Sequence, residues 1–364
     1  MKTRMKAAVL YQAGSPLVVQ EVELHGPGRN EVLVRVAVCG VCHSDLHILR
    51  GEWAGFDPPI VVGHEGAGIV EHVGEGVTAV RPGDHVVLGW KTRCGECAYC
   101  ISGRPYLCDR SPRLDEASSL LKDDLRINRM LSSGFLAGYA VVPQSIAIPI
   151  RAEMPLAQAS LLGCAVMTGV GAAVNTARVQ PGSTVAVFGC GGVGVNVVQG
   201  AALCGATQII GVDIAEDKLE YARAFGLTHG VNAAQEDPVA AIRSLTGGVG
   251  ADYSFEAIGN AKVAEQAFAA LGKGGVAVII GMPAFRETTH LSLPVMPFFG
   301  DRWVTGSYYG GANLWRDVPR MVDLYLAGKL DLDRLVARRY PLEEVNQAFA
   351  DLAGGRPGRG LIVF

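Results

Sequence analysis

The sequence lacks an excess of charge of either sign. Its 32 lysines and arginines nearly balance its 35 aspartates and glutamates, leaving a net charge of -3 and a pI near 6.3. Such a chain has no basic face that would favour nucleic acid and no strong attraction to an anionic membrane. Charged residues make up only 18% of the chain, whereas 49% are hydrophobic. The composition therefore favours large buried cores and small-molecule chemistry.

Repeats and low-complexity tracts are also absent from the sequence. Residues 1–20 lack a continuous apolar core followed by a small-residue cleavage site, so we expect no secretory signal and a cytoplasmic protein. Residues 179–212 carry no charge and are long enough to cross a bilayer. However, Pro181 and several glycines interrupt this stretch. It is better interpreted as a strand, a turn, a helix and a second strand.

The pattern of expected secondary structure changes near residue 165. Before that point, short β-branched runs separated by Pro-Gly pairs predict a β-rich, barrel-like domain, with strands at 31–38, 69–73 and 85–88. After it, strands alternate with helices, which predicts a parallel sheet covered by helices. The expected elements are strands at 184–188, 208–212, 251–255 and 276–280, and helices at 192–204 and 216–225. An amphipathic helix at 314–330 and a short strand at 360–364 follow, and the polar stretch 109–128 is expected to be a surface excursion.

Four cysteines, with spacings of two, two and seven residues, form a compact cluster: Cys94, Cys97, Cys100 and Cys108. Four thiolates can surround one tetrahedral zinc ion if a tight loop wraps around it. Two disulfides or free thiols are the alternatives, but disulfides are uncommon in reduced compartments and nothing else looks secreted. The cluster therefore predicts a structural zinc site with no open position, whose loss would first reduce stability.

A glycine-rich turn follows the expected strand at 184–188. It contains Gly189, Gly191, Gly192, Val193 and Gly194, in a G-x-G-x-x-G pattern. The glycines permit a tight turn and close approach of the backbone to a pyrophosphate, which the following helix N-terminus would bind. This strand–turn–helix context predicts a dinucleotide site.

The next strand ends at Asp213, about twenty residues after the glycine turn, where a carboxylate can accept hydrogen bonds from a ribose 2′-hydroxyl but would repel a 2′-phosphate. NAD is therefore expected rather than NADP, with Lys218 as a second ribose contact. The alternative is that Asp213 is an ordinary surface carboxylate.

A second metal site is indicated by residues 39–47, C-G-V-C-H-S-D-L-H, and by Gly63-His64-Glu65. Cysteine and histidine without a tight four-ligand cluster suggest three protein ligands and an open position. Cys39 and Cys42 also form a C-x-x-C pair, which in another setting would indicate thiol–disulfide chemistry.

Over essentially its whole length the chain resembles the zinc-dependent medium-chain alcohol dehydrogenases. The motifs GVCHSDLH, GHEGAGIVEHVGEGVTAVRPGDHV, the four-cysteine cluster, GCAVMTG and GCGGVG occur in the order of that family. The resemblance implies an α/β protein with a Rossmann-type, doubly wound parallel sheet and a β-rich, GroES-like catalytic domain. The expected bounds are 1–164 and 307–364 for the catalytic domain, with the structural zinc lobe at 94–108, and 165–306 for the NAD-binding domain.

The resemblance also implies a catalytic zinc held by Cys42, His64 and Cys164. By itself, Cys164 would be interpreted as a small buried hydrophobic residue. Glu65 would be an alternate ligand beside the metal, and Asp45 would orient the ligating histidine.

Two further residues would remove the proton of the alcohol. Ser44 matches the hydroxyl that takes the proton, and His47 matches the outer base that receives it through the cofactor ribose. Without the resemblance, His47 would be interpreted as an ordinary helix-surface histidine.

The remaining expected contacts concern cofactor and substrate. His43 replaces an arginine of some relatives at the pyrophosphate, which implies weaker and more pH-dependent binding there. Arg359 matches a second pyrophosphate contact, and Thr168 and Ile258 match positions at the nicotinamide. The candidate apolar substrate pocket consists of Trp53, Trp90, Met130, Leu131 and Tyr308; these residues could instead be core.

The implied activity is the NAD-linked oxidation of alcohols to aldehydes or ketones, and the reverse, by hydride transfer from a zinc-bound alkoxide. The large aromatic candidates favour primary aromatic or medium-chain alcohols. One alternative is a dehydrogenase of the thiol adduct of formaldehyde, for which Arg110 and Arg113 are nearby cations. Another is a non-catalytic zinc and dinucleotide sensor. Two zinc ions per chain and a homo-oligomer, dimer or tetramer, are expected, with residues 294–305 as a pairing edge.

Overall fold

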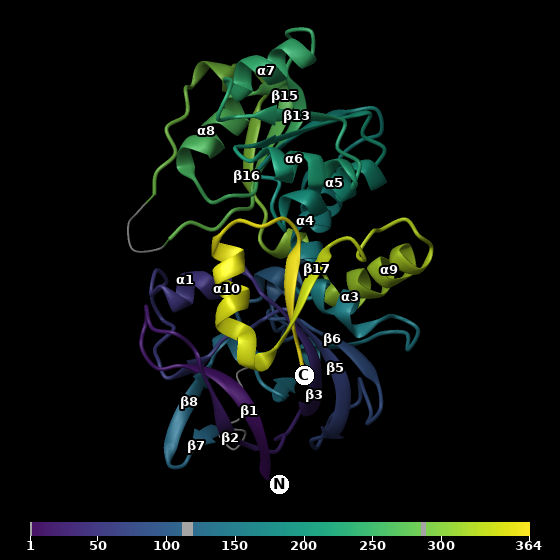
Figure 1. Ribbon diagram of the computed structural model, residues 1–364. Helices are drawn as coiled ribbons and strands as arrows, with labels where there is room; N and C mark the ends of the chain where they lie inside the picture. The colour runs from purple at the N-terminus through teal and green to yellow at the C-terminus, as the bar shows by residue number, and fades with distance from the viewer. Residues whose placement is uncertain (1, 111–118, 285–288) are drawn as a thin grey trace. The chain divides into compact units, whose positions relative to one another are not determined.

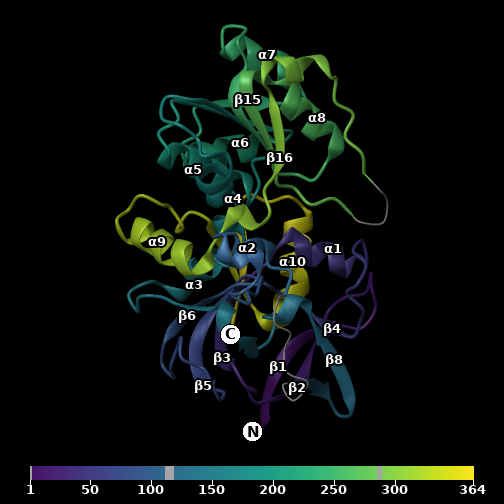
Figure 2. The same ribbon diagram turned by 180° about the vertical axis from the view of Figure 1, so that it is seen from behind.

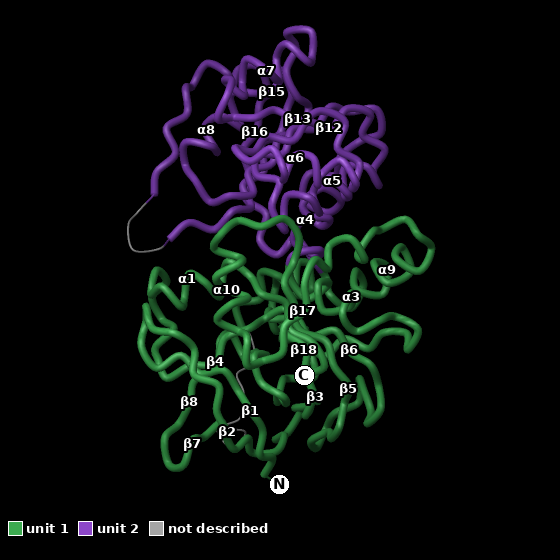
Figure 3. The backbone as a smooth tube through the Cα atoms, viewed as in Figure 1, with its two compact units in different colours: residues 1–164, 313–364 green, residues 165–312 purple. Residues whose placement is uncertain are grey.

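The computed structural model of the chain describes residues 2–110, 119–284 and 289–364 (Figure 1). The chain divides into two compact units: residues 1–164 with 313–364 form unit 1, and residues 165–312 form unit 2 (Figure 3). Residues 307–312 were expected in the first domain but group with unit 2. Their contacts explain the difference, because the hydroxyls of Ser307 and Thr176 lie 2.8 Å apart and the Asn175 amide donates to the Gly310 carbonyl at 3.2 Å.

Five strands of unit 1 close into a barrel. They are, in order around it, β1 (Lys2–Leu10), β2 (Val18–His25), β7 (Leu120–Lys122), β8 (Leu125–Arg129) and β4 (Ile60–Val61). Figures 1 and 2 show the later β8 beside the N-terminal strands. Each of these strands therefore has a hydrogen-bonded neighbour on both sides.

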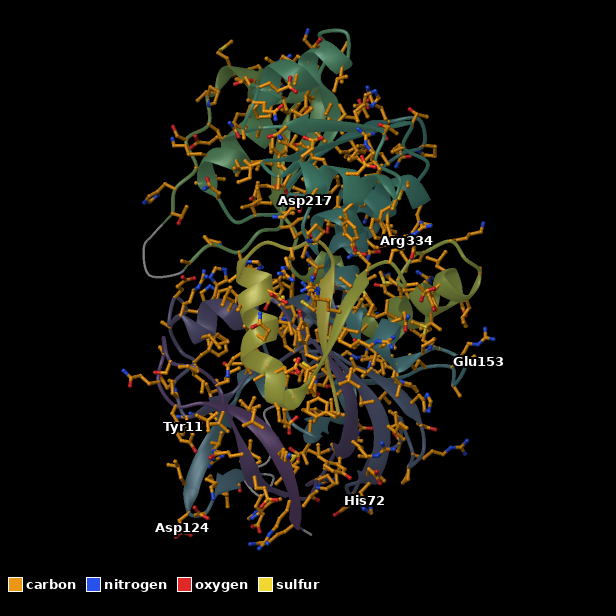
Figure 4. The ribbon with its side chains drawn as sticks, in the orientation of Figure 1. Tyr11, His72, Asp124, Glu153, Asp217 and Arg334 are labelled. Atoms are coloured by element: carbon orange, nitrogen blue, oxygen red, sulfur yellow. The ribbon has the colours of Figure 1, made fainter. Side chains whose placement is uncertain are left out.

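Part of the polar stretch 109–128 is not the surface excursion that we expected. Residues 111–118 lie outside the described part, but β7 and β8 pair as an antiparallel hairpin within the barrel. Figure 4 shows Asp124 at the tip of this hairpin. The hairpin belongs to the barrel because Leu120 and Ile127, paired across its two strands, are both buried.

A second sheet of unit 1 joins the two ends of the chain. Its strands are, in order, β10 (Ala147–Pro149), β6 (His85–Leu88), β5 (Gly66–Val73), β3 (Glu31–Gly40), β18 (Arg359–Val363) and β17 (Val336–Pro341), with β9 (Tyr139–Pro143) also paired to β3. The C-terminal β18 runs antiparallel to β3, with Ile362 opposite Cys39. This pairing brings Arg359 into the neighbourhood of the segment that begins at Cys39.

In the described part of unit 1 the α-helices are α1 (His43–Leu49), α2 (Ala98–Ile101), α3 (Leu156–Leu161), α9 (Leu314–Leu326) and α10 (Val345–Ala353). Helix α3 packs on β3, β5 and β6, while α10 packs on β18 and α1. The helix expected at 314–330 is α9, which ends earlier than expected. A large core is shared by the barrel and the second sheet.

Unit 2 is a parallel sheet with helices. The strand order is β13 (His229–Asn232), β12 (Gln208–Asp213), β11 (Thr184–Phe188), β14 (Ala251–Glu256), β15 (Leu271–Ile279) and β16 (Trp303–Gly306). The helices are α4 (Ala165–Gly171), α5 (Gly194–Leu203), α6 (Glu216–Arg223), α7 (Pro238–Leu245) and α8 (Ala261–Ala269). All neighbouring strands run parallel, which confirms the predicted α/β class.

The strand order of unit 2 reverses at β11. The chain passes from β11 outward to β12 and β13, then returns to the other side of β11 as β14. Val185, Ala186, Val187 and Phe188 of this central strand are almost completely buried, as expected for a strand covered on both faces. Ligands of such folds bind beyond the carboxyl ends of the strands at the point of reversal.

The uncharged stretch 179–212 contains β11, α5 and β12, so its interpretation as strand, helix and strand is confirmed. Within the described ranges, no helix combines the length and the apolar character needed to span a membrane.

Candidate active site and metal centres

The four cysteines of the 94–108 lobe converge in unit 1. Three of their Sγ–Sγ distances are 3.9 Å for Cys94–Cys100, 3.9 Å for Cys97–Cys108 and 3.6 Å for Cys94–Cys108. A tetrahedral ion with Zn–S bonds of about 2.3 Å separates its sulfur atoms by about 3.8 Å. A disulfide would need about 2.05 Å, and these cysteines are free. The spacing therefore fits a four-thiolate zinc site and not disulfides.

Backbone groups of the lobe support thiolate ligands. The Cys97 amide lies 3.3 Å from the Sγ of Cys94, and the Cys94 amide lies 3.4 Å from the Sγ of Cys108. Such N–H donors stabilise negative charge on sulfur. Lys91 fixes the end of the lobe by donating to the Cys108 carbonyl at 2.8 Å. Four protein ligands leave no open position, as a structural site requires.

A second cluster forms from three distant segments of unit 1. Cys42 immediately precedes α1, His64 lies between β4 and β5, and Cys164 follows α3. All three side chains are buried, and one potential ligand atom of each lies within 4.8 Å of the others. Three converging ligands are typical of a zinc site that keeps a fourth position for water or substrate.

The Asp45 carboxylate accepts hydrogen bonds from two ligand residues of this cluster and from their neighbour Gly63. Its Oδ1 accepts from His64 Nδ1 at 3.0 Å and from the Gly63 amide at 2.9 Å, while its Oδ2 accepts from the Cys42 amide at 3.3 Å. Because an ionised carboxylate only accepts, His64 carries its proton on Nδ1 and has its lone pair on Nε2. That Nε2 is buried and has no hydrogen-bond partner among the described residues. A metal ion would satisfy it.

The electrostatics of the cluster also suit a cation. A hydrogen bond from Cys164 and the nearby His64 lower the pKa of Cys42 well below that of an ordinary thiol. Burial opposes protonation of His64, but the Asp45 carboxylate and Cys42 raise the pKa of its imidazole well above the usual range. The donor set thus fits zinc.

Glu65, next to the ligand His64, pairs with Arg359. The Nη2 of Arg359 lies 2.5 Å from the Oε2 of Glu65, and both side chains are buried. Gly40 makes room for this pair, since a Cβ there would lie 2.1 Å from the same oxygen. Glu65 was expected as an alternate metal ligand and Arg359 as a pyrophosphate contact. In the structure each engages the other, and both expected roles stay predictions.

The two residues expected to move the proton lie on α1. Ser44 is half-buried in its first turn, and His47 is half-buried in its last turn. The Nδ1 of His47 lies 2.5 Å from the Oε2 of Glu52, and its ring stacks on Trp53 with centroids 5.0 Å apart. Glu52 could not be predicted from the sequence, because its spacing of five residues from His47 matches no helical pairing.

In unit 2, the glycine turn lies at the carboxyl end of β11. Its compactness requires glycine at both ends, because a Cβ at Gly194 would lie 1.7 Å from the Gly189 carbonyl oxygen, and a Cβ at Gly189 2.6 Å from Ile258. Helix α5 begins at Gly194, so its first amides face the end of the sheet. The turn therefore has the geometry expected for pyrophosphate binding.

Asp213, at the end of β12, is nearly buried beside this turn. Its Oδ2 accepts from the Cys190 amide at 2.9 Å and its Oδ1 from the Ala215 amide at 3.2 Å. Burial and the Asp213 carboxylate raise the pKa of the Cys190 thiol to about 12, so this thiol is protonated. Lys218 is half-buried on α6. Asp213 is thus not an ordinary surface carboxylate, and its ribose contact stays a prediction.

Glu256, at the end of the neighbouring β14, was also missed. Its Oε1 accepts from three consecutive amides, those of Ile258 at 2.8 Å, Gly259 at 2.7 Å and Asn260 at 3.2 Å. The buried carboxylate therefore fixes the loop that carries Ile258. Its position directly after a predicted strand was the only signal in the sequence.

The five candidates for a substrate pocket have different surroundings. In unit 1, Trp53 and Met130 are buried in the core, Trp90 is half-buried and Leu131 is 38% exposed. Tyr308 belongs to unit 2 and is exposed. The expected cofactor contacts are similarly divided, with exposed His43 in unit 1 and half-buried Thr168 in unit 2. A shared pocket stays a prediction.

Both units of the chain match known protein families. Residues 28–152 match the profile of the alcohol dehydrogenase GroES-like domain, and residues 192–327 match that of the zinc-binding dehydrogenases. An NDMA-dependent alcohol dehydrogenase of Amycolatopsis methanolica is 41% identical, over 100% of this chain and 99% of its own length. The chain belongs to the zinc-dependent medium-chain alcohol dehydrogenase family.

The names of two further relatives state the substrates of those proteins. An S-(hydroxymethyl)glutathione dehydrogenase of Paracoccus denitrificans is 38% identical, over 99% of this chain and 100% of its own length. The crystal structure of benzyl alcohol dehydrogenase from Acinetobacter calcoaceticus superimposes with a TM-score of 0.93 at 32% identity, covering 100% of this chain and 99% of the other. The chain is therefore an alcohol dehydrogenase-type oxidoreductase.

Proposed function

We propose that this chain oxidises primary aromatic or medium-chain alcohols to aldehydes, reversibly, with NAD and a catalytic zinc. The observation that carries this proposal is the buried cluster of Cys42, His64 and Cys164, with Asp45 directing the free Nε2 of His64 into it. A protein that needed zinc only for its fold would not need three ligands and an open position. The similarity to a benzyl alcohol dehydrogenase supports an aromatic substrate.

Each unit would contribute separate parts of the reaction. When bound, zinc would supply Lewis acidity that makes the alcohol hydroxyl more acidic, and NAD would accept the hydride. Cys42, His64 and Cys164 would hold the metal, and Asp45 keeps the His64 ring oriented. Ser44 would take the hydroxyl proton and His47 would receive it, as general base catalysis requires.

In unit 2, the amides at the start of α5 would bind the pyrophosphate, and Asp213 would bind the ribose hydroxyls. The loop fixed by Glu256 would present Ile258 to the nicotinamide. NAD rather than NADP is proposed because a buried carboxylate repels a 2′-phosphate. The name of the Amycolatopsis relative makes NDMA an oxidant to include in any assay.

A second candidate function is the oxidation of the thiol adduct of formaldehyde. The similarity to the Paracoccus S-(hydroxymethyl)glutathione dehydrogenase favours it. Such a substrate would need cations for its carboxylates. Arg110 is exposed and within the described part, whereas Arg113 lies outside it.

Steady-state assays separate these functions. Benzyl alcohol, hexanol and formaldehyde, the last with and without glutathione, would each be tested with NAD, NADP and NDMA. Turnover of benzyl alcohol or hexanol with NAD alone supports the proposal. Turnover of only the glutathione adduct contradicts the alcohol substrate, and a requirement for NDMA contradicts NAD as the exchangeable oxidant. Normal NAD binding with one zinc and no turnover would favour the sensor.

A matched pair of variants tests the metal assignment. Cys42→Ser removes a ligand and should abolish turnover while leaving NAD binding and the fold in place. Cys39→Ser is the control, because Cys39 is an equally buried thiol whose Sγ donates to the Gly40 carbonyl at 3.5 Å and lies outside the cluster. Retained activity in Cys42→Ser would remove Cys42 from the site.

We further propose that the protein is cytoplasmic and forms homo-oligomers. Support for self-association comes from β16, which is the edge strand of the unit 2 sheet in the described chain. The 3₁₀ helix η6 (Met296–Gly300) precedes it, and the large apolar side chains of both are exposed, namely Met296, Phe298, Phe299 and Trp303.

A further inference from the structure

Glu52 and Trp53 hold the ring of His47 from two directions. After α1 the chain turns back, so that the Glu52 amide donates to the His47 carbonyl at 2.8 Å. This turn brings the Glu52 Oε2 to 2.5 Å from the Nδ1 of His47. Trp53 stacks on the imidazole with an interplanar angle of 17° and is itself packed in the core of unit 1. The ring therefore has little freedom to rotate.

The Glu52 contact selects one tautomer of His47. An ionised carboxylate can only accept a hydrogen bond, so Nδ1 is the nitrogen that carries hydrogen in the neutral ring. Within the described ranges, Glu52 is the residue that hydrogen-bonds to a ring nitrogen of His47. The lone pair is consequently on Nε2, which is left to accept a proton from outside the pair.

Glu52 also matters after the proton arrives. The side chains of His47 and Glu52 are 20% and 28% exposed, so solvent screens their charges only in part. The Glu52 carboxylate then faces a positively charged imidazolium, and the face of Trp53 offers a further attraction for a cation. Glu52 and Trp53 would therefore contact the ring both before and after His47 accepts a proton.

We propose that Glu52 is a positioning residue that keeps the Nε2 of His47 as the proton acceptor. This inference rests on the alcohol oxidation proposed above. In that reaction the alcohol hydroxyl loses its proton, which Nε2 takes up and later releases to water, while Nδ1 keeps its own proton. The electron pair of the broken C–H bond leaves as the hydride that NAD accepts, so the products are aldehyde, NADH and one proton.

The alternative is that Glu52 only anchors the turn at residues 51–53. An ion pair that is partly open to solvent usually contributes little to stability. A structural anchor would lower stability and would affect activity whether or not His47 is present. A positioning residue acts only through His47, which makes the two possibilities separable.

The test uses full-length, zinc-loaded protein and the variants Glu52→Gln, Glu52→Asp, His47→Gln and the double variant with Glu52→Gln. Glu71→Gln is the control, since Glu71 pairs with Arg35 on the exposed surface of β5. We expect Glu52→Gln to lower kcat for benzyl alcohol about tenfold, to raise the solvent isotope effect and to leave KM for NAD within about twofold. Glu52→Asp, which keeps the charge, should recover much of the loss.

In the His47→Gln background, Glu52→Gln should cost nothing further, since coupled residues are not additive. A full additional loss in that background, or unchanged kcat in Glu52→Gln, would overturn the inference. Thermal unfolding of each variant separates these effects from a loss of stability.

A second readout does not depend on turnover. Two-bond ¹H–¹⁵N spectra of ¹⁵N-histidine-labelled protein report the tautomer of each of the 8 histidines, and His47→Gln assigns the signal. We expect the Nδ1–H tautomer for His47, and its loss in Glu52→Gln. An unchanged tautomer overturns the positioning role alone, whereas unchanged turnover in His47→Gln contradicts the proton route of the proposed function.

Discussion

Glu65 and Arg359 form a buried ion pair that joins the segment after the ligand His64 to the C-terminal strand. Their charged atoms lie 2.5 Å apart, with side-chain exposures of 0% and 5%. The pairing of β18 with β3 is the backbone cause, because it carries Arg359 to the carboxylate. The negative charge of Glu65 is thereby balanced locally by the Arg359 guanidinium.

Removing one partner of this pair should therefore be costly. Glu65→Gln leaves the Arg359 guanidinium buried without its countercharge, and we expect a loss of about 3–5 kcal/mol in the free energy of unfolding. Urea unfolding of the zinc-loaded protein measures it. Glu71→Gln, in the exposed Arg35 pair, is the control and should cost less than about 1 kcal/mol. Equal losses would show that burial does not matter here.

Asp45→Asn should weaken zinc binding without unfolding the chain. Three groups donate hydrogen bonds to Asp45: the His64 ring, the Gly63 amide and the Cys42 amide. An asparagine would turn its own N–H₂ donor toward one of them, and that hydrogen bond would be lost. Loss of such an orienting carboxylate typically lowers metal affinity about 10–100-fold. Competition with a chelator measures this change. Asp84→Asn, at a surface turn where Asp84 accepts from the Arg81 amide, should leave affinity unchanged.

Cys97→Ser should distinguish the role of the four-cysteine lobe from that of the catalytic metal site. With one of its four thiolates gone, the lobe is expected to release its zinc, so that zinc content falls from two ions to one per chain. We expect a lower melting temperature, whereas turnover below that temperature should largely persist. Elemental analysis and thermal unfolding measure both effects. If turnover disappears while the fold is intact, the lobe is more than structural.

The sequence was most informative where ligands are close neighbours. The spacing of Cys94, Cys97, Cys100 and Cys108 predicted one site, and the structure brings their sulfur atoms to tetrahedral separations. The glycine turn was equally predictable, because a strand, a turn and a helix follow one another directly. In both cases the chemistry is contained in a short segment, so it can be seen without tertiary structure.

Residues whose roles depend on distant contacts could not be found in this way. Cys164 was assigned only through the family resemblance, since the fold alone brings it to Cys42 and His64. The partnership of Glu65 with Arg359 spans 294 residues and was missed. The β7–β8 hairpin was misjudged because its polar, exposed residues hid the two buried positions that close the barrel, Leu120 and Ile127.

Asp213→Gly should reduce the preference for NAD over NADP. The variant removes the carboxylate that would repel a 2′-phosphate, so the ratio of kcat/KM for the two cofactors should narrow. The structure adds a second effect, because the Cys190 amide also loses its acceptor and the glycine turn is expected to loosen. Affinity for NAD should thus fall as well. An unchanged ratio of the two cofactors would mean that Asp213 does not contact the ribose.

Phe299→Asp tests whether the apolar surface of unit 2 pairs copies of the chain. Phe299 is 81% exposed and lies on η6, directly before the edge strand β16 with its 62% exposed Trp303. An exposed edge strand beside large apolar side chains is normally covered by another surface. A buried charge at such an interface is unfavourable, so the variant should shift the chain toward monomer in light scattering. Val249→Asp is the control, because Val249 is 69% exposed but lies in the loop before β14. The particle mass measured for this variant should equal that of the unmodified chain. If both variants keep the same mass as the unmodified chain, self-association does not use this edge.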